Sequence, residues 1–417
     1  MPPLRVAYDL TPAVRQRAGI GRYARELGRA LAAREDIDVT WFVADRLDPA
    51  GRAAAAAMVG APVEAVRSMP LTSRVLTFAW HRLGLPLPIG PWLRRGAVGG
   101  TGAPTGAPTG APTAAADRID VFHATDYLAP PHPGAPTVVT VHDLSFLRHP
   151  ELAEPSLASF LRRAVPRSVR RAAHVLADSA WTRDDVIALL GVPPERVSVA
   201  YAGVDAAYRP VAAADDGAIR ARLGVDRPYI LGVGTIEPRK DWVTLIDAFV
   251  AATSAGDVGG AGDVALLRDY ALVLAGGLGW RTEATLAALR EAVARGADVR
   301  LIGFVADADL PALYRGADAF AFPSRYEGFG LPPLEAMACG VPTAVSDASC
   351  LPEVTGDAAL HVPAGDVAAW AAALRILVGD GALRARLAAA GPARAAGFDW
   401  AGGAAAVVGV YESVAGN

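Results

Sequence analysis

Short apolar runs alternate along the chain with longer stretches rich in Ala, Leu and Arg, which have the spacing of amphipathic helices. Ten of the short runs have the length and composition of strands, and they begin at Leu4, Asp38, Asp120, Thr137, His174, Tyr229, Tyr270, Val299, Ala319 and Pro342. Several are apolar at every position, which is typical of parallel strands that helices cover on both faces. Strands that alternate with helices predict parallel sheets, and two successive series predict two doubly wound α/β domains.

The segment 201–211, YAGVDAAYRPV, separates the two series and precedes a polar stretch. We therefore predict one Rossmann-like domain at 1–205 and a second at 206–397. The last helix, within 398–417, is expected to pack back on the first domain. An insertion at about 96–117 contains the tandem repeat TGAPTGAPTGAPT, whose small residues and prolines cannot bury a core and predict a mobile surface loop.

The charges of this 417-residue chain nearly balance, with 40 basic and 43 acidic side chains and a formal net charge of −3. This balance gives no reason to expect nucleic acid as a partner. The two cysteines, Cys339 and Cys350, lack zinc-type spacing and exclude a disulfide framework, which fits a cytoplasmic protein. No apolar run approaches the roughly 18–20 residues that span a bilayer. The start, MPPLRVAYDL, is expected to form a strand rather than a signal peptide.

The segment YEGFGLPPLEAMACGVPTAVSD, from Tyr326 to Asp347, follows a predicted strand and carries two glutamates, Glu327 and Glu335. Between the glutamates lie Gly328, Phe329, Gly330 and Leu331, and then two prolines that suit a first helical turn. The glycines allow a close approach of the backbone to a ligand, and the helix N-terminus after them suits a phosphate. The alternative is a Gly-Pro turn with two solvated glutamates.

The segment GVGTIEPRKDWVTLIDAF, from Gly232, also ends a strand and opens a helix, at the sheet edge where doubly wound folds bind ligands. Arg239 and Lys240 can reach a diphosphate there and stabilise it as a leaving group. The alternative is a basic pair neutralised by Glu237 and Asp241. The segment lacks the third glycine of a dinucleotide fingerprint and the glycine before the lysine of a Walker loop.

In the first half, candidate polar residues again follow predicted strands. RAGIGRY places Gly19 and Gly21 in a tight loop before a helix, although plain strand–helix turns share this pattern. TVVTVHD places His142 and Asp143 at the carboxyl end of a strand, facing the expected cleft, although an isolated histidine is usually structural. His123 and Asp126, after the strand DVFHA, are candidates to line the acceptor side.

The segment from Tyr326 to Asp347 resembles the signature of family-4 retaining glycosyltransferases, which have the GT-B fold of two Rossmann-like domains facing across a cleft. The resemblance implies that Glu327 contacts the donor sugar and Glu335 the ribose of a nucleotide-sugar. It implies that backbone N–H groups near Gly330 and Leu331 hold the diphosphate. The first domain would then bind the acceptor and the second the donor.

The same resemblance assigns roles to other candidates. Lys240 falls on the family's donor lysine, whereas Thr235 stands where many relatives carry an arginine, for which Arg239 or the Thr235 hydroxyl would compensate. The loop at Gly19 and Gly21 would touch donor phosphates. His142 would lie beside the donor sugar and hydrogen-bond it, and Asp143 would orient His142 or bind the acceptor. The predicted catalytic residues are therefore His142, Glu327, Lys240 and Arg239.

HDLSFLRHPE together with GTIEPRKD is most similar to the branch of mannosyl- and rhamnosyltransferases that act on polysaccharides. The resemblance implies a hexose donor, first GDP-mannose, and a saccharide, lipid-linked or small-molecule acceptor. It implies retention of configuration, with the leaving phosphate accepting the acceptor proton. No Asp-x-Asp pair follows a strand, so neither a metal nor a cofactor is expected. The alternatives are an inactive nucleotide- or carbohydrate-binding relative and a sugar-nucleotide epimerase of the same fold.

The run LRRAVPRSVRRAAH at 161–174 is basic. It fits either a solvated helix face or contact with a membrane surface or a lipid-linked acceptor. The expected location is therefore the cytoplasm, with peripheral contact to the inner face of the membrane as the second possibility. The sequence does not indicate an oligomeric state.

Overall fold

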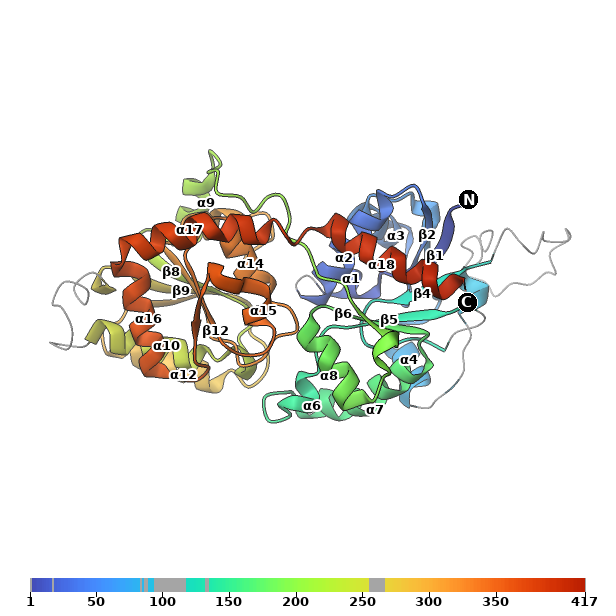
Figure 1. Ribbon diagram of the computed structural model, residues 1–417, viewed down its shortest axis with the longest axis horizontal. Coiled ribbons are helices and arrows are strands. Elements are labelled where there is room, and N and C mark those ends of the chain that lie inside the picture. The colour runs from blue at the N-terminus through green and yellow to red at the C-terminus, as the bar shows by residue number, and fades with distance from the viewer. Residues whose placement is uncertain are drawn as a thin grey trace, which may run out of the picture.

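The computed structural model describes residues 2–16, 19–82, 85, 89–93, 118–131, 135–254 and 267–416. The insertion predicted at about 96–117 lies outside these residues. Figure 1 shows two α/β halves side by side, each built around its own sheet, with the chain passing between them near residue 205 and again near residue 398.

The sheet of the first half has seven parallel strands in the order β3-β2-β1-β4-β5-β6-β7. The strands are β1 (Leu4–Asp9), β2 (Ile37–Val43), β3 (Val66–Ser68), β4 (Val121–Ala124), β5 (Thr137–Val141), β6 (His174–Ala177) and β7 (Val197–Val199). All five strands predicted in this half are present. The prediction missed β3 and β7, which are three-residue edge strands too short to show a pattern.

The sheet of the second half has six parallel strands in the order β10-β9-β8-β11-β12-β13. The strands are β8 (Tyr229–Val233), β9 (Ala271–Ala275), β10 (Val299–Gly303), β11 (Ala319–Phe322), β12 (Thr343–Ser346) and β13 (Leu360–Val362). Only β13, again a short edge strand, was not predicted. The strand order reverses between β8 and β11, and ligands of doubly wound folds bind at the carboxyl ends of strands at such a switch point.

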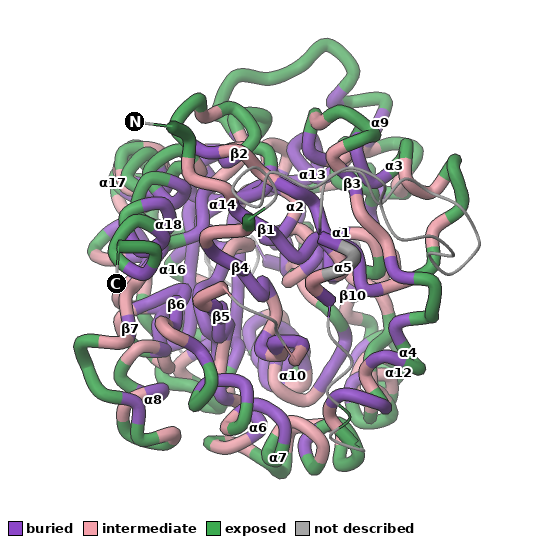
Figure 2. The backbone as a smooth tube through the Cα atoms, turned by 90° about the vertical axis from the view of Figure 1, so that its right-hand side faces the viewer, coloured by how far each residue is buried: buried purple, intermediate pink, exposed green. Residues whose placement is uncertain are grey.

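Helices cover both faces of each sheet. In the first half they are α1 (Thr11–Arg15), α2 (Ile20–Ala32), α3 (Pro49–Val59), α4 (Ser73–Thr77), the π-helix η2 (Phe78–Arg82), α5 (Gly90–Leu93), α6 (Ser145–Arg148), α7 (Pro155–Arg171) and α8 (Ala180–Leu190). In the second half they are α9 (Asp216–Arg222), α10 (Trp242–Ser254), α12 (Glu283–Ala294), α13 (Leu310–Arg315), α14 (Leu331–Ala338), α15 (Leu351–Thr355), α16 (Val367–Gly379) and α17 (Gly381–Ala395). The helix that follows them, α18 (Trp400–Ala415), returns to the first half. Figure 2 shows the strands buried and the outer faces of the helices exposed.

The final helix, α18, lies on the first half, where it packs against α2, β4 and β6 (Figure 1). Asp399 caps it by accepting a hydrogen bond from the N–H of Gly402 at 2.7 Å. The two connections between the halves meet just before this helix, where the N–H of Val204 donates to the carbonyl oxygen of Phe398 at 3.0 Å. A side chain at Gly203 would overlap the backbone of Trp400, so the crossing requires glycine there.

The two halves are also in direct contact on either side of the crossing. The Tyr326 hydroxyl, from the second half, donates to Asp185 of α8 at 2.6 Å. Glu353 of α15 accepts hydrogen bonds from the N–H groups of Ala180 and Trp181, which begin α8, at 2.7 and 3.0 Å. A carboxylate of one half therefore caps a helix of the other half, and residues at the facing edges of the two sheets are brought together.

Candidate functional site

Glu327 lies in the loop after β11, buried between two cations. Its carboxylate forms ion pairs with Nζ of Lys240 at 2.7 Å and with the guanidinium of Arg239 at 2.8 Å. Ser324 donates a further hydrogen bond to it. Burial opposes ionisation, but Arg239 and Lys240 outweigh it and lower the pKa of Glu327 to about 2. The structure thus brings together three predicted residues from two strand ends.

The alternative pairing predicted for the basic residues is present only in part. Arg239 pairs with Glu237 at 2.8 Å, as the alternative required. Asp241 instead pairs with Arg325 at 2.9 Å, and Lys240 forms its ion pair with Glu327. The prediction that Asp241 neutralises this basic pair is therefore wrong, because the αL conformation of Asp241 and the position of Arg325 set a different partner.

Glu335 lies on α14, eight residues after Glu327, and is almost fully buried. Its carboxylate forms an ion pair with Arg22 of α2, so the contact spans the two halves. Gly330 begins α14 with a φ of 100°, a conformation that favours glycine. The two prolines that follow Leu331 have no N–H group, so the backbone donors at this helix start are those of Gly330 and Leu331, and no described side chain caps them. These two N–H groups remain available to an anion, as predicted for the diphosphate.

Gly328 lies against the first half of the molecule. A Cβ atom at this position would overlap the carbonyl oxygen of His142, so only glycine allows this approach. The hydroxyl of Thr182 lies 3.2 Å from the carbonyl oxygen of Gly328 and 3.4 Å from that of His142. Next to Gly328, Phe329 packs on Tyr201, with ring centroids 6.1 Å apart. The glycine-rich loop therefore lies in the contact between the two halves.

His142 follows β5 at this contact, with both ring nitrogens occupied. Nδ1 lies 2.7 Å from Asp178, and Nε2 lies 2.8 Å from the carbonyl oxygen of Thr125. Burial lowers the pKa of His142, but Asp178 and the other acceptors outweigh it and raise the pKa to about 9. The predicted hydrogen bond from this ring to a sugar is therefore not available in this conformation, because protein acceptors already bind both nitrogens.

The carboxylate that orients His142 belongs to Asp178 rather than to Asp143, so that part of the prediction is wrong. Asp178 follows β6, the neighbour of β5, and the two strand ends place their side chains together. Asp143 instead accepts a hydrogen bond from the N–H of Ser145 at 2.9 Å and starts a turn. Its side chain is half-buried, so acceptor binding by Asp143 stays a prediction.

His123 is fully buried and does not line the acceptor side, contrary to the prediction. Nδ1 lies 2.6 Å from the hydroxyl of Tyr411 on α18, and Nε2 lies 2.8 Å from the hydroxyl of Thr140. Burial lowers its pKa to about 3, so the ring is neutral. The imidazole joins the sheet to the final helix, because β4 lies at the centre of the sheet, beneath α18.

The other candidates lie near this contact in different settings. Asp126 is half-buried, and burial raises the pKa of its carboxyl. Thr235 is exposed, and its carbonyl oxygen accepts a hydrogen bond from the indole of Trp242 at 3.1 Å. Gly19 begins α2 with a φ of 58°, whereas a side chain at Gly21 would overlap the backbone of Gln16. Both glycines are therefore required by the turn itself, and phosphate contact by this loop stays a prediction.

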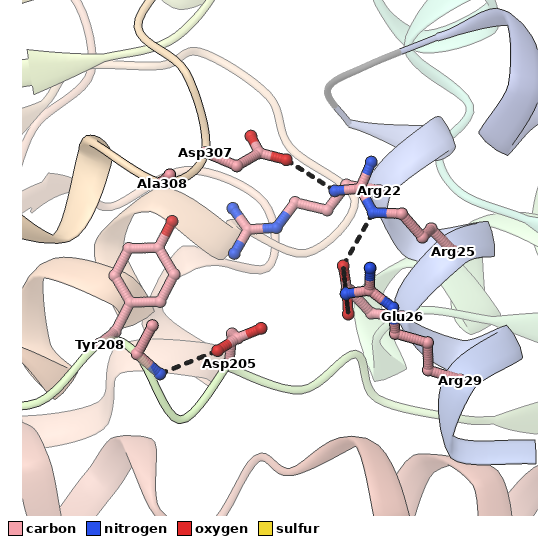
Figure 3. Close-up of a pocket in the computed structure, with 9 residues that line it drawn as sticks. Arg22, Arg25, Glu26, Arg29, Asp205, Tyr208, Asp307 and Ala308 are labelled. Atoms are coloured by element: carbon pink, nitrogen blue, oxygen red, sulfur yellow. Dashed lines mark hydrogen bonds and ion pairs between the residues drawn. The ribbon is translucent and has the colours of Figure 1, made fainter. Parts of the chain in front are cut away.

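A pocket of about 420 Å³ opens between α2 and the second half, next to the Arg22–Glu335 ion pair. Figure 3 shows side chains of α2 on one side of it and Tyr208, Asp205 and Asp307 on the other. The two acidic residues before α13 form ion pairs with arginines instead of capping the helix. Asp307 pairs with Arg25 of α2 at 2.7 Å, and Asp309 pairs with Arg222 at 2.7 Å.

Comparison with known proteins identifies the family. The model described as Glycosyl transferases group 1 matches residues 216–394, and the model described as Glycosyltransferase Family 4 matches residues 17–208. O-antigen chain mannosyltransferase B of Escherichia coli is 32% identical over 281 residues, which are 67% of this chain and 71% of that protein. D-inositol 3-phosphate glycosyltransferase of Salinispora arenicola is 32% identical over 306 residues, 69% of this chain and 67% of that protein. The chain is a family-4 glycosyltransferase.

Solved structures share the fold of this glycosyltransferase. Sucrose-phosphate synthase from Thermosynechococcus elongatus superposes with a TM-score of 0.67 at 19% identity, over 99% of both chains. HepE of Anabaena, in complex with UDP and glucose, superposes with a TM-score of 0.67 at 19% identity, over 98% of this chain and 100% of that chain. Together with the two parallel sheets, these matches confirm the predicted GT-B architecture.

Three residues of the glycosyltransferase site were missed from the sequence. Arg22 directly follows Gly21 in RAGIGRY, and Asp178 follows a strand next to the one that ends at His142. Ser324 lies two residues after the end of β11, in the segment that leads to Glu327. A polar residue directly after a strand or a glycine was the available signal, but its partner could not be chosen without the fold.

Proposed function

We propose that this glycosyltransferase transfers mannose from GDP-mannose, with retention of configuration and without a metal, to a saccharide, a lipid-linked sugar or a small molecule. The observation that carries the proposal is the carboxylate of Glu327 held between Lys240 and Arg239, next to the uncapped start of α14. In this arrangement the donor diphosphate would meet the positive charges of Lys240 and Arg239, and the sugar would meet the negative charge of Glu327. The similarity to a mannosyltransferase supports the choice of sugar.

The leaving nucleoside diphosphate gains negative charge as the bond to the sugar breaks. Lys240 and Arg239 offset this charge, and the N–H groups of Gly330 and Leu331 at the start of α14 stabilise it further. Until the donor arrives, Glu327 holds both cations in position. Because these groups are fixed before the reaction, they need no reorganisation at the transition state.

The engagement of Glu327 argues against a covalent enzyme adduct as the route to the proposed retention. A carboxylate bound by two cations and a hydroxyl, with a pKa of about 2, is a poor nucleophile towards the sugar. We therefore propose attack by the acceptor hydroxyl on the face from which the diphosphate leaves, with a phosphate oxygen taking the proton. NMR of the product anomer tests retention. A covalent sugar adduct on Glu327, detected by mass spectrometry, would contradict the same-face step.

The pocket beside the Arg22–Glu335 ion pair is proposed to take the nucleobase, because Glu335 is proposed to bind the ribose. Arg22 lies over the ring of Tyr208 at 5.2 Å, and such a pair offers a flat surface for a base. Asp307 faces the same pocket and offers a carboxylate to the two adjacent N–H donors of guanine. Uracil offers a single such donor, which favours GDP over UDP.

A thermal-shift panel of ADP, CDP, GDP and UDP tests the donor site, with Glu335→Ala and the exposed control Glu195→Ala alongside. Stabilisation by GDP that is lost in Glu335→Ala but kept in Glu195→Ala would support the proposal. Stabilisation by another nucleotide instead of GDP would assign a different base to the donor. No shift with any of them would favour an inactive relative. Activity that disappears on chelation would contradict transfer without a metal.

A further inference from the structure

An apolar stripe lies on the outside of the first half, on and beside the short helix pair α4 and η2. It consists of Leu71, Val75, Phe78 and Leu85, whose exposed fractions run from 41% to 51%. Val75 and Phe78 share one side of the helix pair and Leu71 and Leu85 flank it in the chain, while Leu76 and Trp80 on the other side are buried in the core. The helix pair is therefore apolar on both sides, and the stripe is left to solvent.

Six exposed arginines surround this stripe and form the arginine face: Arg74, Arg82, Arg163, Arg167, Arg170 and Arg171. Within the residues that the structure describes, none of the six makes an ion pair or a side-chain hydrogen bond. Several arginines elsewhere form ion pairs, as Arg300 does with Asp298 and Arg315 with Asp216. The sequence explains the contrast, because 65–116 and 155–177 contain no Asp or Glu.

The stripe and the arginines of α7 belong to one surface. The rings of His81 on η2 and Phe160 on α7 are 6.2 Å apart, which joins the two helices. Burial, Arg171 and Arg167 together lower the pKa of His81 to about 4, so these arginines lie close to η2. A neutral His81 leaves the surface to the guanidinium groups, while Leu157, 47% exposed, adds an apolar side chain at the start of α7.

We propose that the apolar stripe and the arginine face form a docking surface for a bilayer that contains anionic lipids. Apolar side chains on a short amphipathic helix enter the boundary between headgroups and acyl chains, while arginines keep their charge at the phosphate level. Anionic headgroups supply the counter-charges that the six arginines lack within the described chain. A soluble acidic polymer would bind the arginines but would make no apolar contact with Val75 and Phe78. A bilayer with anionic lipids would bind both the arginines and the apolar side chains.

Co-sedimentation of the full chain with vesicles tests the proposal, and it does not depend on the donor. We expect binding to vesicles of phosphatidylglycerol and phosphatidylcholine in equal parts, weakened by salt, and none to phosphatidylcholine alone. Val75→Glu/Phe78→Glu should abolish binding. Arg163→Ala/Arg167→Ala should weaken it about 30-fold, since each arginine near the surface contributes about 1 kcal/mol. All four substituted side chains are exposed, so the melting temperature should stay unchanged.

Val293→Glu, on α12 of the other half, is the matched control, because Val293 is 52% exposed and receives the same new charge. It should bind vesicles as the wild type does. Absence of binding to the anionic vesicles would overturn the proposal, as would equal loss in the control. Binding of dextran sulfate that depends on Arg163 and Arg167, with vesicle binding unaffected by Val75→Glu/Phe78→Glu, would assign the surface to a soluble polymer instead.

Discussion

Arg22 on α2 forms an ion pair with Glu335 on α14, a residue 313 positions later in the chain. Both side chains are largely buried, and the pair closes one side of the contact between the two halves. The carboxylate that we propose for the donor ribose is thus held by a cation of the other half. A donor that binds Glu335 through its ribose must share or displace Arg22.

The first prediction concerns this ion pair. Arg22→Met leaves the Glu335 carboxylate buried without its charged partner, which costs roughly 3–5 kcal/mol. We expect the melting temperature to fall by about 6 °C or more. The double variant Arg22→Met/Glu335→Gln removes both charges and should melt above Arg22→Met. Differential scanning calorimetry of the three proteins measures this, and an unchanged melting temperature in Arg22→Met would show that the pair contributes little.

Lys240→Met should lower kcat by roughly 10²–10³-fold, because it removes a positive charge from the leaving diphosphate. Arg325→Met is the matched control. Arg325 is a cation of the same region that pairs with Asp241 and is 47% exposed, so its loss should leave kcat within about twofold of the wild type. Initial rates of sugar transfer measure both. If kcat fell equally in the two variants, the effect would come from the overall positive charge of the region and not from contact between Lys240 and the donor.

Gly328→Ala should abolish transfer while the protein stays folded. The added methyl group would overlap the carbonyl oxygen of His142, so the glycine-rich loop could no longer approach the first half. Gly409→Ala on α18 is the control, since a side chain there meets open space. Small-angle X-ray scattering should show a larger radius of gyration for Gly328→Ala alone. A fully active Gly328→Ala would show that this close approach is not needed for transfer.

The pair of His142 and Asp178 predicts a dependence of stability on pH. The pKa of His142 in the folded protein, about 9, lies above its unfolded value of about 6.5. Its contribution, up to about 3 kcal/mol, is therefore complete below about pH 6.5 and is lost as the pH rises through about 9. Melting temperatures between pH 6 and pH 10 should fall for the wild type and change less for Asp178→Asn. Parallel curves would contradict the assignment.

The position of His123 predicts a loss of stability without a change in acceptor binding. Tyr411→Phe removes the hydroxyl that meets Nδ1 of His123 in the core, which should cost about 1–3 kcal/mol. The KM for the acceptor should stay unchanged. Asp143→Asn should raise the KM for the acceptor and leave the stability unchanged. The amide can still accept the turn hydrogen bond from Ser145, but it has lost the charge. Calorimetry and acceptor titrations distinguish the two outcomes.

The strands could be predicted from local pattern alone. A run such as ALVLA at Ala271 is apolar at every position, and such a run is stable only when both of its faces are covered. The edge strands β3, β7 and β13 were beyond prediction, because three residues show no periodicity and their pairing depends on a neighbour elsewhere in the chain. The glycines at Gly328 and Gly330 were also readable, since a close approach and a positive φ restrict the residue type at a single position.

The sequence by itself determined which polar groups follow strands and therefore reach the edges of the two sheets. The tertiary structure alone decided their partners: Asp178 rather than Asp143 for His142, Glu327 rather than Asp241 for Lys240, and Arg22 for Glu335. The tertiary structure also places the side chain of His123 in the core. The physical reason is that backbone preferences and periodicity act over a few residues, whereas the energy of an ion pair or a buried imidazole depends on which distant segments the two sheets bring within about 3 Å.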